Sequence, residues 1–509
     1  MADAVQQQAQ VARQTKVAES AGPKNIVICC DGTGNEFGDT NSNVVKFYTA
    51  LMIDDGQVGY YHPGVGTMGD PAARGPIARK WSQIIGMAFA FGFKDNVFDA
   101  YRYLMTIYND GDHVFLFGFS RGAYTVRALA GLLDGYGLLC KGNEGHIPYA
   151  WRLYTEQLQD RRGRQVDGGK QSARAFKEAF SRKNFMIQFI GIWDTVSSVG
   201  WITSPLRLFN VAQNPSIRNG RQAISVDERR CFYADNLWGD PLMVGEPPEK
   251  QDILQVWFSG VHSDVGGSYE QKDAGLSNIT LEWMLLEAQS KGVKLVEERV
   301  DVVLGRPAVE ENYRATRALY KTPKSNEPHE SLRGWWWLLE FLPHIYYDKD
   351  RGVELRRVPL GARRELPAGS LVHHTVKERI DRAKAHAAQR KLDGRRRLGP
   401  LHYQPDNVTC GTLTAVPIPE TGHQSQAQSD PLYRYEPGQD QRSNTFKRLS
   451  VLWAFILLYV VLAFVLVQVG IELFAHAWPV LEHGLVVGSE WVIGHLDGID
   501  HWVLRHIGF

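Results

Sequence analysis

The chain has little cysteine and almost no net charge. Its five cysteines are scattered along 509 residues: Cys29, Cys30, Cys140, Cys231 and Cys410. An odd number at these spacings excludes a disulfide framework and a zinc site, so we expect a reducing compartment for the main domain. The 57 Lys and Arg nearly balance the 56 Asp and Glu, so no overall field attracts nucleic acid. We predict no nucleic-acid partner.

Two further features are missing from the first 35 residues. Residues 1–23 are polar and rich in Gln and Ala, and we predict a disordered segment without the apolar core of a signal peptide. The loop at 31–35 contains glycines but is not followed by Gly-Lys-Ser/Thr, which excludes a P-loop. With 44% hydrophobic and 22% charged residues, the chain as a whole has the composition of a globular protein.

A long apolar run lies near the C-terminus. Residues 449–471 carry no charge over 23 residues, which is enough for a helix to cross a bilayer. Lys447 and Arg448 precede the run, whereas Arg505 is the one Lys or Arg among the 38 residues that follow it. We therefore predict a membrane protein with one C-terminal transmembrane helix, an amphipathic tail, and the large N-terminal part on the cytoplasmic side.

Strands alternate with helices over the first 300 residues. Short apolar runs predict strands, and apolar residues at helical spacing predict helices. The predicted strands are 24–30, 58–62, 113–119, 185–192 and 253–260, and the predicted helices are 95–108, 121–133 and 278–290. This alternation predicts an α/β fold with a mostly parallel sheet and helical insertions.

The pattern divides the chain into five predicted segments. They are the disordered segment 1–23, an α/β core at 24–300, a Trp-rich and basic helical extension at 301–403 that completes or covers the core, a linker at 404–445, and the membrane segment 446–509. Within the extension, the Trp-rich residues 335–342 indicate a packed helix, a lid or a membrane-facing surface. The basic residues 377–398 indicate a solvated helix face or a site for anionic headgroups.

The central chemical signal is Gly118-Phe119-Ser120-Arg121-Gly122. A predicted strand enters this G-x-S-x-G and a predicted helix leaves it, which is the context of the nucleophile elbow in α/β hydrolases. Gly118 and Gly122 permit the tight turn, and Ser120 is then the candidate nucleophile at the helix N-terminus. The backbone amide of Arg121 is a candidate donor to an oxyanion.

A serine nucleophile needs a base, and the base needs an acid that orients it. Asp194 follows the predicted strand at 185–192, and His262 follows the one at 253–260. Their order after Ser120 is that of an α/β-hydrolase triad, so we predict Ser120, Asp194 and His262 as the catalytic residues. Two alternatives remain open: Asp264 as the orienting acid or a cation ligand, and His373 or His374 as the base.

The loop Asp31-Gly32-Thr33-Gly34-Asn35 ends the first predicted strand. Its small residues let the backbone approach the nucleophile, so the amide of Gly32 or Thr33 is a candidate to complete the oxyanion hole. Asp31 is a turn former or, with Asp264, a metal ligand. We predict no resident metal or cofactor.

Several of these segments together resemble a known family. They are ICCDGTGN, GFSRGAYTVRALAG, WDTV, the DERR at 227–230 and WFSGVHSDVGGSY. In this order they are similar to the type VI secretion phospholipase-effector-like α/β hydrolases, over residues 25–283 and more loosely to residue 407. The resemblance implies an α/β-hydrolase core, the triad Ser120, Asp194 and His262, and phospholipase A-type ester hydrolysis.

The same resemblance bears on partners and location. It implies a phospholipid or other acyl-ester substrate, and an immunity protein or a secretion spike as candidate protein partners. A secreted effector acts in the envelope of a target cell, whereas a resident membrane hydrolase stays where its C-terminal helix holds it. The sequence therefore predicts a membrane-anchored serine hydrolase of acyl esters, most simply phospholipids. The alternatives are a serine esterase for a non-lipid ester and a catalytically idle scaffold at the membrane.

Overall fold

The computed structural model describes residues 22–32, 38, 40–64, 92–156, 167–183, 185–196, 200–201, 204–205, 213–244, 249–306, 327–334, 336–341, 344–348, 353–392, 405–409, 411–416 and 431–437. The chain divides into two units, Met1–Gln439 and Asp440–Phe509, and the second lies outside the described residues. The predicted membrane helix at 449–471 and almost all of the predicted disordered segment 1–23 also lie outside them. Over the residues that are described, no helix is long and apolar enough to cross a membrane.

Nine strands of the described chain form one sheet in the order β2-β1-β3-β4-β7-β10-β13-β15-β14. They are β1 (Asn25–Cys30), β2 (Gln57–His62), β3 (His113–Phe119), β4 (Ile187–Trp193), β7 (Ile217–Ser225), β10 (Asp252–Phe258), β13 (Leu371–His373), β14 (Gly411–Ala415) and β15 (Leu432–Pro437). Three separate antiparallel pairs are β5 (Gly200–Trp201) with β6 (Ser204–Pro205), β8 (Met243–Val244) with β9 (Glu249–Lys250), and β11 (His344–Asp348) with β12 (Val353–Arg357).

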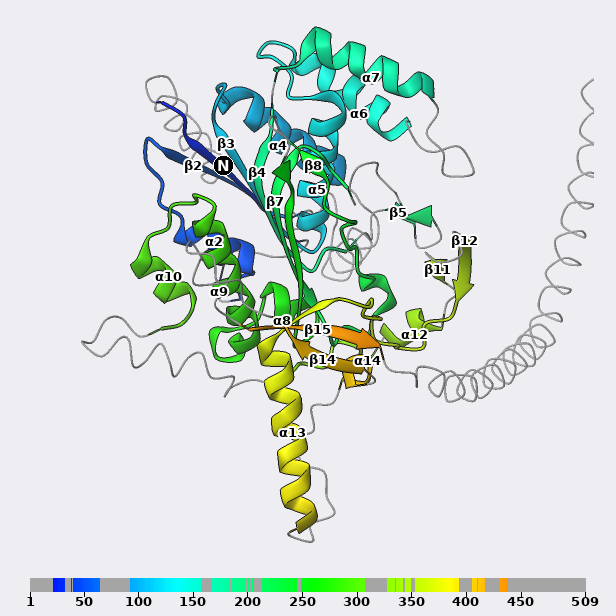
Figure 1. Cartoon of the computed structure of the whole chain (residues 1–509). Helices are drawn as coiled ribbons and strands as arrows, with labels where there is room; N and C mark the ends of the chain where they lie inside the picture. Colours follow the sequence, from blue (N-terminus) through cyan, green and yellow to red (C-terminus); the bar gives the residue numbers. More distant parts are fainter. Residues whose placement is uncertain are drawn as a thin grey trace, which may run out of the picture. The chain divides into compact units, whose positions relative to one another are not determined.

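The described helices lie between and after these strands (Figure 1). They are α2 (Asn43–Ala50), α4 (Phe93–Ile107), α5 (Arg121–Tyr136), α6 (Ile147–Glu156), α7 (Asp167–Phe180), α8 (His262–Gly266), α9 (Gly275–Ser290), α10 (Glu297–Val303), α12 (Trp336–Glu340), α13 (His374–Leu392) and α14 (Asp406–Thr409). Short 3₁₀ turns are η1 (Glu144–His146), η2 (Cys231–Tyr233) and η3 (Gln271–Asp273).

The sheet is parallel from β2 to β13, and β15 and β14 add two antiparallel strands at its other end. This confirms the predicted α/β fold with a mostly parallel sheet. The five predicted strands and three predicted helices are all present, with ends that differ by up to three residues. From β1 the chain first moves outward to β2, then returns to β3 on the other side of β1 and continues outward in the opposite direction. In open α/β sheets such a reversal creates a crevice at the carboxyl ends of the two strands, where ligands bind.

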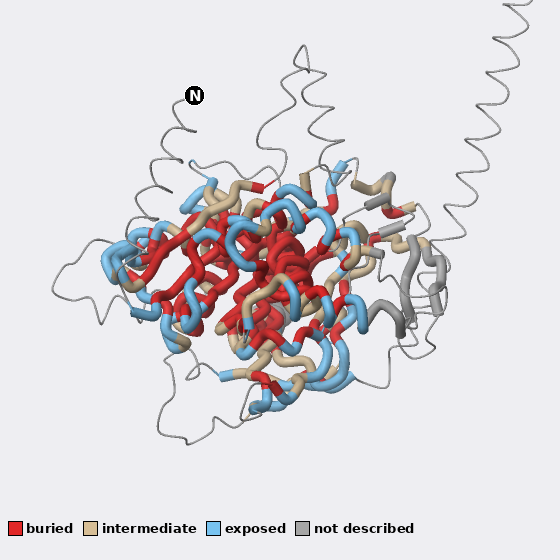
Figure 2. The backbone as a smooth tube through the Cα atoms, turned by 90° about the horizontal axis from the view of Figure 1, so that it is seen from above, coloured by how far each residue is buried: buried red, intermediate tan, exposed pale blue. Residues whose placement is uncertain are grey.

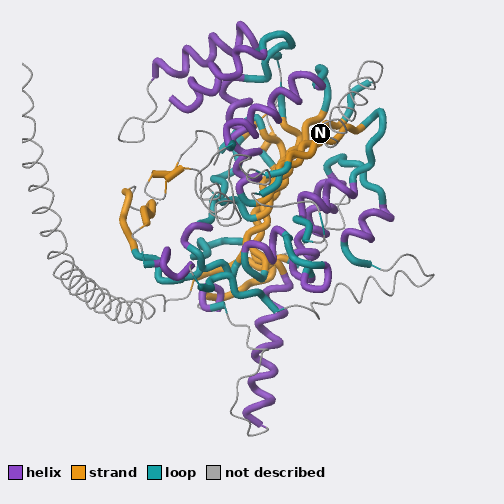
Figure 3. The backbone as a smooth tube through the Cα atoms, turned by 180° about the vertical axis from the view of Figure 1, so that it is seen from behind, coloured by secondary structure: helices purple, strands orange, loops and turns teal. Residues whose placement is uncertain are grey.

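The hydrophobic core has two layers because side chains alternate between the faces of a strand. Ile26 and Ile28 of β1 belong to one buried cluster with residues of α4, α5, α6 and α7, whereas Val27 and Cys29 belong to another with residues of α2 and α9. The strands accordingly run between two groups of helices (Figure 3). The buried residues gather in the interior, and the exposed ones lie toward the outside (Figure 2).

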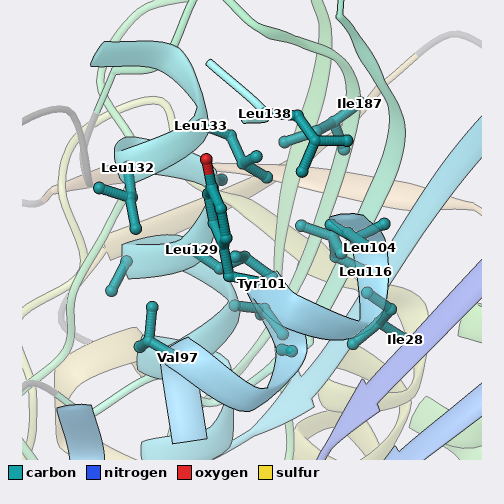
Figure 4. Packing of buried hydrophobic residues seen from close by; sticks show 14 of the residues in the cluster. Ile28, Val97, Tyr101, Leu104, Leu116, Leu129, Leu132, Leu133, Leu138 and Ile187 are labelled. Atoms are coloured by element: carbon teal, nitrogen blue, oxygen red, sulfur yellow. The ribbon is translucent and has the colours of Figure 1, made fainter. Parts of the chain in front are cut away.

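Packing between α4 and α5 illustrates the first layer. Tyr101 of α4 lies among Leu129, Leu132 and Leu133 of α5 (Figure 4). Its hydroxyl donates to the carbonyl of Gly137 at 2.7 Å and accepts from the amide of Leu139 at 2.9 Å. The buried hydroxyl is therefore satisfied, and the chain after α5 is held against α4.

Some of these strands are not among the predicted elements. β7 lies in the middle of the sheet but contains Arg221, whose buried guanidinium pairs with Glu287 at 2.6 Å and Asp252 at 2.8 Å. A polar strand of this kind shows no apolar run, so its burial depends on partners distant in sequence. Two segments inside the predicted linker 404–445, β14 and β15, also join the sheet.

Candidate active site

The candidate residues follow the carboxyl ends of neighbouring strands. In the sheet register Cys30 of β1 faces Gly118 of β3, and Phe119 of β3 faces Trp193 of β4. The next residues along the three strands are Asp31, Ser120 and Asp194, so the parallel sheet brings them to one edge. This edge includes the β1–β3 crevice at which the topology reverses.

Ser120 occupies a strained turn between β3 and α5. Its backbone has φ 58° and ψ −121°, a combination that non-glycine residues rarely adopt. Its amide donates to the carbonyl of Trp193 at 3.1 Å, which ties the turn to β4. The residue is 7% exposed. The strand–turn–helix geometry is that of a nucleophile elbow.

Glycines permit close backbone contacts around this turn. A Cβ on Gly122 would lie 2.1 Å from the carbonyl oxygen of Cys30, and one on Gly118 would lie 2.6 Å from the backbone of Gly122. A Cβ on Gly266 of α8 would lie 1.8 Å from the ring of Phe119. The elbow, the end of β1 and α8 therefore meet at distances that no side chain tolerates.

Replacing Gly122 with Ala is expected to lower the free energy of unfolding by about 1–3 kcal/mol, because the clash is with backbone that has no rotamer to change. Gly135, also in α5, has nothing within 4 Å of an added Cβ. Gly135→Ala is therefore the matched control and is expected to raise stability by up to about 1 kcal/mol. Urea unfolding of both variants measures the difference. Equal effects of the two substitutions would contradict the close contact at Gly122.

Asp194 and His262 form a hydrogen-bonded pair. Oδ2 of Asp194 accepts from Nδ1 of His262 at 2.5 Å, and both side chains are buried. This bond leaves Nε2 of the imidazole to exchange a proton with another group. The ring of His262 contacts those of Phe119 and Tyr233, with ring centroids 4.6 Å apart in each case. These contacts fix the plane of the imidazole at the sheet edge that carries Ser120.

Burial and charge act in opposite directions on this pair. Burial lowers the pKa of His262 below its usual 6.5 although the hydrogen bond and charge of Asp194 act to raise it, so the imidazole is neutral at neutral pH. For Asp194, burial opposes ionisation, but the charges and hydrogen bonds of Arg364 and His262 outweigh it and lower the pKa below the usual 3.8. Asp194 therefore stabilises the fold above pH 3.8 and loses this contribution as the pH falls further.

The structure brings to the pair residues that sequence reasoning did not assign. The guanidinium of Arg364 is buried against the carboxylate of Asp194, with Nη1 at 2.5 Å from Oδ1 and Nη2 at 3.0 Å from Oδ2. Oε2 of Glu228 accepts from the amide of His262 at 3.1 Å, and Arg230 lies 2.9 Å from the same carboxylate. Glu228 and Arg230 belong to the DERR segment, which entered the resemblance without a role. Arg364 lies 170 residues from Asp194, and no spacing rule connects the two positions.

The loop after β1 lies against the elbow, and the carboxylate of Asp31 in this loop accepts several hydrogen bonds. Asp31 accepts hydrogen bonds from Ser42 Oγ at 2.6 Å, Tyr61 Oη at 3.0 Å and the amide of Gly32 at 2.6 Å. As an oxyanion donor, Gly32 would have to leave its bond to Asp31. Thr33 lies outside the described residues. Arg121 is the first residue of α5, where amide groups lie outside the i→i−4 ladder of the helix.

The open alternatives for acid and base lie elsewhere. Asp264 accepts from the amide of His329 at 3.0 Å, and its Oδ1 lies 2.6 Å from Nδ1 of the same residue. His373 lies on β13, which three strands separate from β3, and its Nδ1 is 2.9 Å from Oγ1 of Thr375. His374 begins α13 and faces Glu378 at 3.8 Å. Nδ1 of His262 is bonded to Asp194, whereas Asp264 is bonded to His329.

Metal ligation and the Trp-rich segment can be judged in the part of the chain that is described. There, no group of three or more His, Cys, Asp or Glu side chains is arranged to hold a metal ion. The Trp-rich segment forms the short helix α12, and the ring of Trp336 lies 5.6 Å from that of Tyr233, which itself contacts His262. The segment predicted as a packed helix, a lid or a membrane-facing surface thus contacts Tyr233, and Tyr233 contacts the imidazole of His262.

Comparison with known proteins gives one family and a few relatives. The model of the catalytic domain of Tle1-like phospholipase effectors of the type VI secretion system matches residues 24–287. The uncharacterized protein YEL023C of Saccharomyces cerevisiae is 36% identical over 222 residues, which are 42% of this chain and 32% of the yeast protein. The match thus spans about a third of the length of this relative.

Two solved structures are similar at low sequence identity. An uncharacterized protein from Pseudomonas aeruginosa has a TM-score of 0.36 and 17% identity, and the match covers 64% of this chain and 55% of the other. A Tle1 effector bound to the VgrG spike of a type VI secretion system has a TM-score of 0.32 and 15% identity, with 61% and 82% covered. The family match covers just over half of the 509 residues, and the chain therefore belongs to the Tle1-like phospholipase effectors.

Proposed function

We propose that the protein is a serine hydrolase that cleaves acyl esters of phospholipids through Ser120, His262 and Asp194. The observation that carries the proposal is the 2.5 Å bond between Asp194 and His262 at the sheet edge where Ser120 forms its strained turn. Membership of a phospholipase effector family supports a lipid substrate. A scaffold without activity gains nothing from a buried imidazole that an aspartate holds at the sheet edge that carries Ser120.

In the first half of the reaction, Ser120 attacks the ester carbonyl carbon and His262 Nε2 takes the hydroxyl proton. The carboxylate of Asp194 holds Nδ1–H, which fixes the tautomer and stabilises the imidazolium that forms. The amide of Arg121 at the N-terminus of α5 and that of Gly32 or Thr33 are the proposed donors to the tetrahedral oxyanion. The imidazolium then protonates the leaving alcohol, which is the lysophospholipid.

In the second half, water replaces the alcohol. His262 Nε2 takes a proton from the water as its oxygen attacks the acyl-serine carbonyl. Collapse of the second tetrahedral intermediate breaks the bond to Ser120 Oγ, which regains the proton from the imidazolium. The products are a free fatty acid and the original enzyme, so the cycle requires no redox or nucleotide cofactor.

Membrane attachment through residues 449–471 is part of the same proposal. An enzyme held at a bilayer meets phospholipid at a high local concentration. A soluble ester is not concentrated at the bilayer in this way. The span follows from the uncharged length of the run, which is sufficient for a bilayer. A secretion spike and an immunity protein remain the predicted protein partners, in keeping with the effector family.

Hydrolysis of mixed phospholipid vesicles by the full-length protein tests the substrate class. We expect release of both lysophospholipid and free fatty acid by the wild-type protein, and release of neither by Ser120→Ala. Labelling of the two proteins with a fluorophosphonate runs in parallel, because only an activated serine reacts. Labelling without lipid hydrolysis would indicate that the substrate is a non-lipid ester and not a phospholipid. A wild-type protein that is neither labelled nor active would favour the idle scaffold and refute the proposal.

A further inference from the structure

The aspartate of the proposed triad is enclosed by donors. Its Oδ1 accepts from the amide of Ser225 at 2.9 Å, from Oγ of Ser225 at 3.0 Å and from Arg364 Nη1 at 2.5 Å. Its Oδ2 accepts from His262 at 2.5 Å and from Arg364 Nη2 at 3.0 Å. The two guanidinium nitrogens therefore span the carboxylate, and one oxygen serves both the arginine and the imidazole.

We infer that Arg364 is a positioning residue for the triad, which orients the Asp194 carboxylate toward His262 and limits the positive charge that the imidazole can take up. The inference rests on the proposed function. It adds to the site a residue from outside residues 24–287, the part of the chain that matches the family's catalytic domain.

Arg364 is itself held by contacts that do not involve Asp194. Its Nε donates to the carbonyl of Tyr233 at 2.9 Å, and Nη1 donates to Oγ of Ser225 at 2.7 Å. Its own carbonyl accepts from the side-chain amide of Asn407 at 2.9 Å, and this amide also donates to the carbonyl of Val226. These contacts hold the guanidinium in place independently of Asp194. The guanidinium can therefore orient the carboxylate.

The carboxylate of Asp194 requires such a fixed partner because the backbone of this residue is in an unusual conformation. Its φ is 38°, in the left-handed region that aspartate tolerates better than most residues but at a cost. Asp194 lies in the turn between β4 and the loop that follows. Its backbone amide donates to the carbonyl of Ala223 of β7 at 2.8 Å. Bidentate contact with a planar guanidinium allows one orientation of the carboxylate plane, and Oδ2 then lies at the imidazole.

The charges around the imidazole are nearly balanced. The charged groups that act within and around the Asp194–His262–Arg364 cluster are the carboxylates of Asp194, Glu228 and Asp235 and the guanidinium groups of Arg230 and Arg364. Glu228 is in turn paired with Arg230, and these bonds outweigh burial to lower its pKa to about 2. With Arg364 in place, the guanidinium offsets part of the negative charge that Asp194 exerts on His262. Without Arg364, the full negative charge would act on the imidazole and favour its protonation.

The pH dependence of kcat/KM on a soluble acyl ester tests this role in the full-length protein. For the wild type we expect an acid limb below 6.5, since burial lowers the pKa of His262. Arg364→Met is expected to move this limb upward by about one pH unit and to lower kcat roughly 100-fold, with KM unchanged. Arg364→Lys keeps the positive charge but loses the bidentate contact with Asp194. We therefore expect the acid limb to stay in place while kcat falls roughly tenfold.

Arg221→Met is the matched control. Arg221 is also a fully buried arginine paired with two carboxylates, but its partners are Asp252 and Glu287. Its loss is expected to lower thermal stability without moving the acid limb. An upward shift in Arg221→Met equal to that in Arg364→Met would overturn the inference, because it would show that the limb reports stability alone. An unmoved limb in folded Arg364→Met would also overturn it.

A second readout separates this inference from the proposed function. The imidazole of His262 is followed by ¹⁵N NMR of histidine-labelled protein and assigned by comparison with His262→Gln. Its titration is expected to shift upward in Arg364→Met and not in Arg364→Lys, whether or not Ser120 reacts. Should Arg364→Met fail to fold, Arg364→Lys decides: a kcat equal to that of the wild type would overturn the inference. A wild type that does not hydrolyse esters would refute the proposed function and leave the titration as the test of Arg364.

Discussion

Replacing Ser120 with Ala is expected to lower kcat on acyl esters by about 10⁵- to 10⁶-fold, the size of effect that loss of the nucleophile has in serine hydrolases. In the proposed mechanism, the substitution removes the oxygen that forms the acyl-enzyme, and no other group of the proposed triad can replace it. It keeps the Cβ and the backbone, so the strained turn at φ 58° has the same cost in both proteins. Thermal stability should therefore be close to that of the wild type.

Steady-state hydrolysis of a soluble ester, with the melting temperature of each protein, checks this expectation. The soluble ester removes access to a lipid surface as an explanation for lost activity. Thr125, on α5 near its N-terminus, donates from its hydroxyl to the carbonyl of Arg121 at 3.0 Å and makes a conservative control. Thr125→Ala should keep most of the activity. A Ser120→Ala protein that is folded and retains more than about 1% of the wild-type kcat would rule out Ser120 as nucleophile.

Asp194→Asn is expected to have the next largest effect, a fall in kcat of about 10⁴-fold. The amide has nearly the shape of the carboxylate, but it no longer stabilises the imidazolium and it favours the wrong tautomer of His262. The same change leaves the buried guanidinium of Arg364 opposite a neutral group. Breaking a buried ion pair on one side costs about 3–5 kcal/mol, so the melting temperature should fall as well.

The two effects can be separated by a matched substitution and by a double variant. Asp252→Asn makes the same change in another aspartate that pairs with a buried arginine, Arg221, and should leave kcat unaltered. The double variant Asp194→Asn with Arg364→Met has no unpaired buried charge, so its loss of stability should be smaller than the sum of the two single losses. Its activity should stay as low as that of Asp194→Asn. A strictly additive loss of stability would contradict the pairing of Asp194 with Arg364.

The elements that could be predicted from the sequence are those with a strong local pattern. After their first residue, β1 and β3 are continuous apolar runs apart from Gly118, and the helix after Ser120 is rich in Ala and Leu. The positions of Asp194 and His262 were predicted because both follow apolar strands in the order that a triad requires. The structure places the two side chains in contact.

Other parts of the site have no local pattern. β7 contains Arg221 and Gln222 in a buried central strand, which only the partners of these side chains make possible. Asp264, two residues from His262, was the alternative candidate to orient it, and its carboxylate bonds to His329. Helix α8 turns the two side chains in different directions, and spacing in sequence does not reveal which direction each takes.

The sequence by itself determined the α/β architecture of the core, the nucleophile turn and the order of the candidate triad, because strand burial, helix periodicity and turn chemistry act over a few neighbouring residues. Only the tertiary structure decided which side chains meet at the edge of the sheet. Arg364 reaches Asp194 across 170 residues of chain, and Glu228 bonds to the amide of His262 across 34. Such contacts depend on how strands order themselves in the sheet and which loops close over it, and no local pattern carries that information.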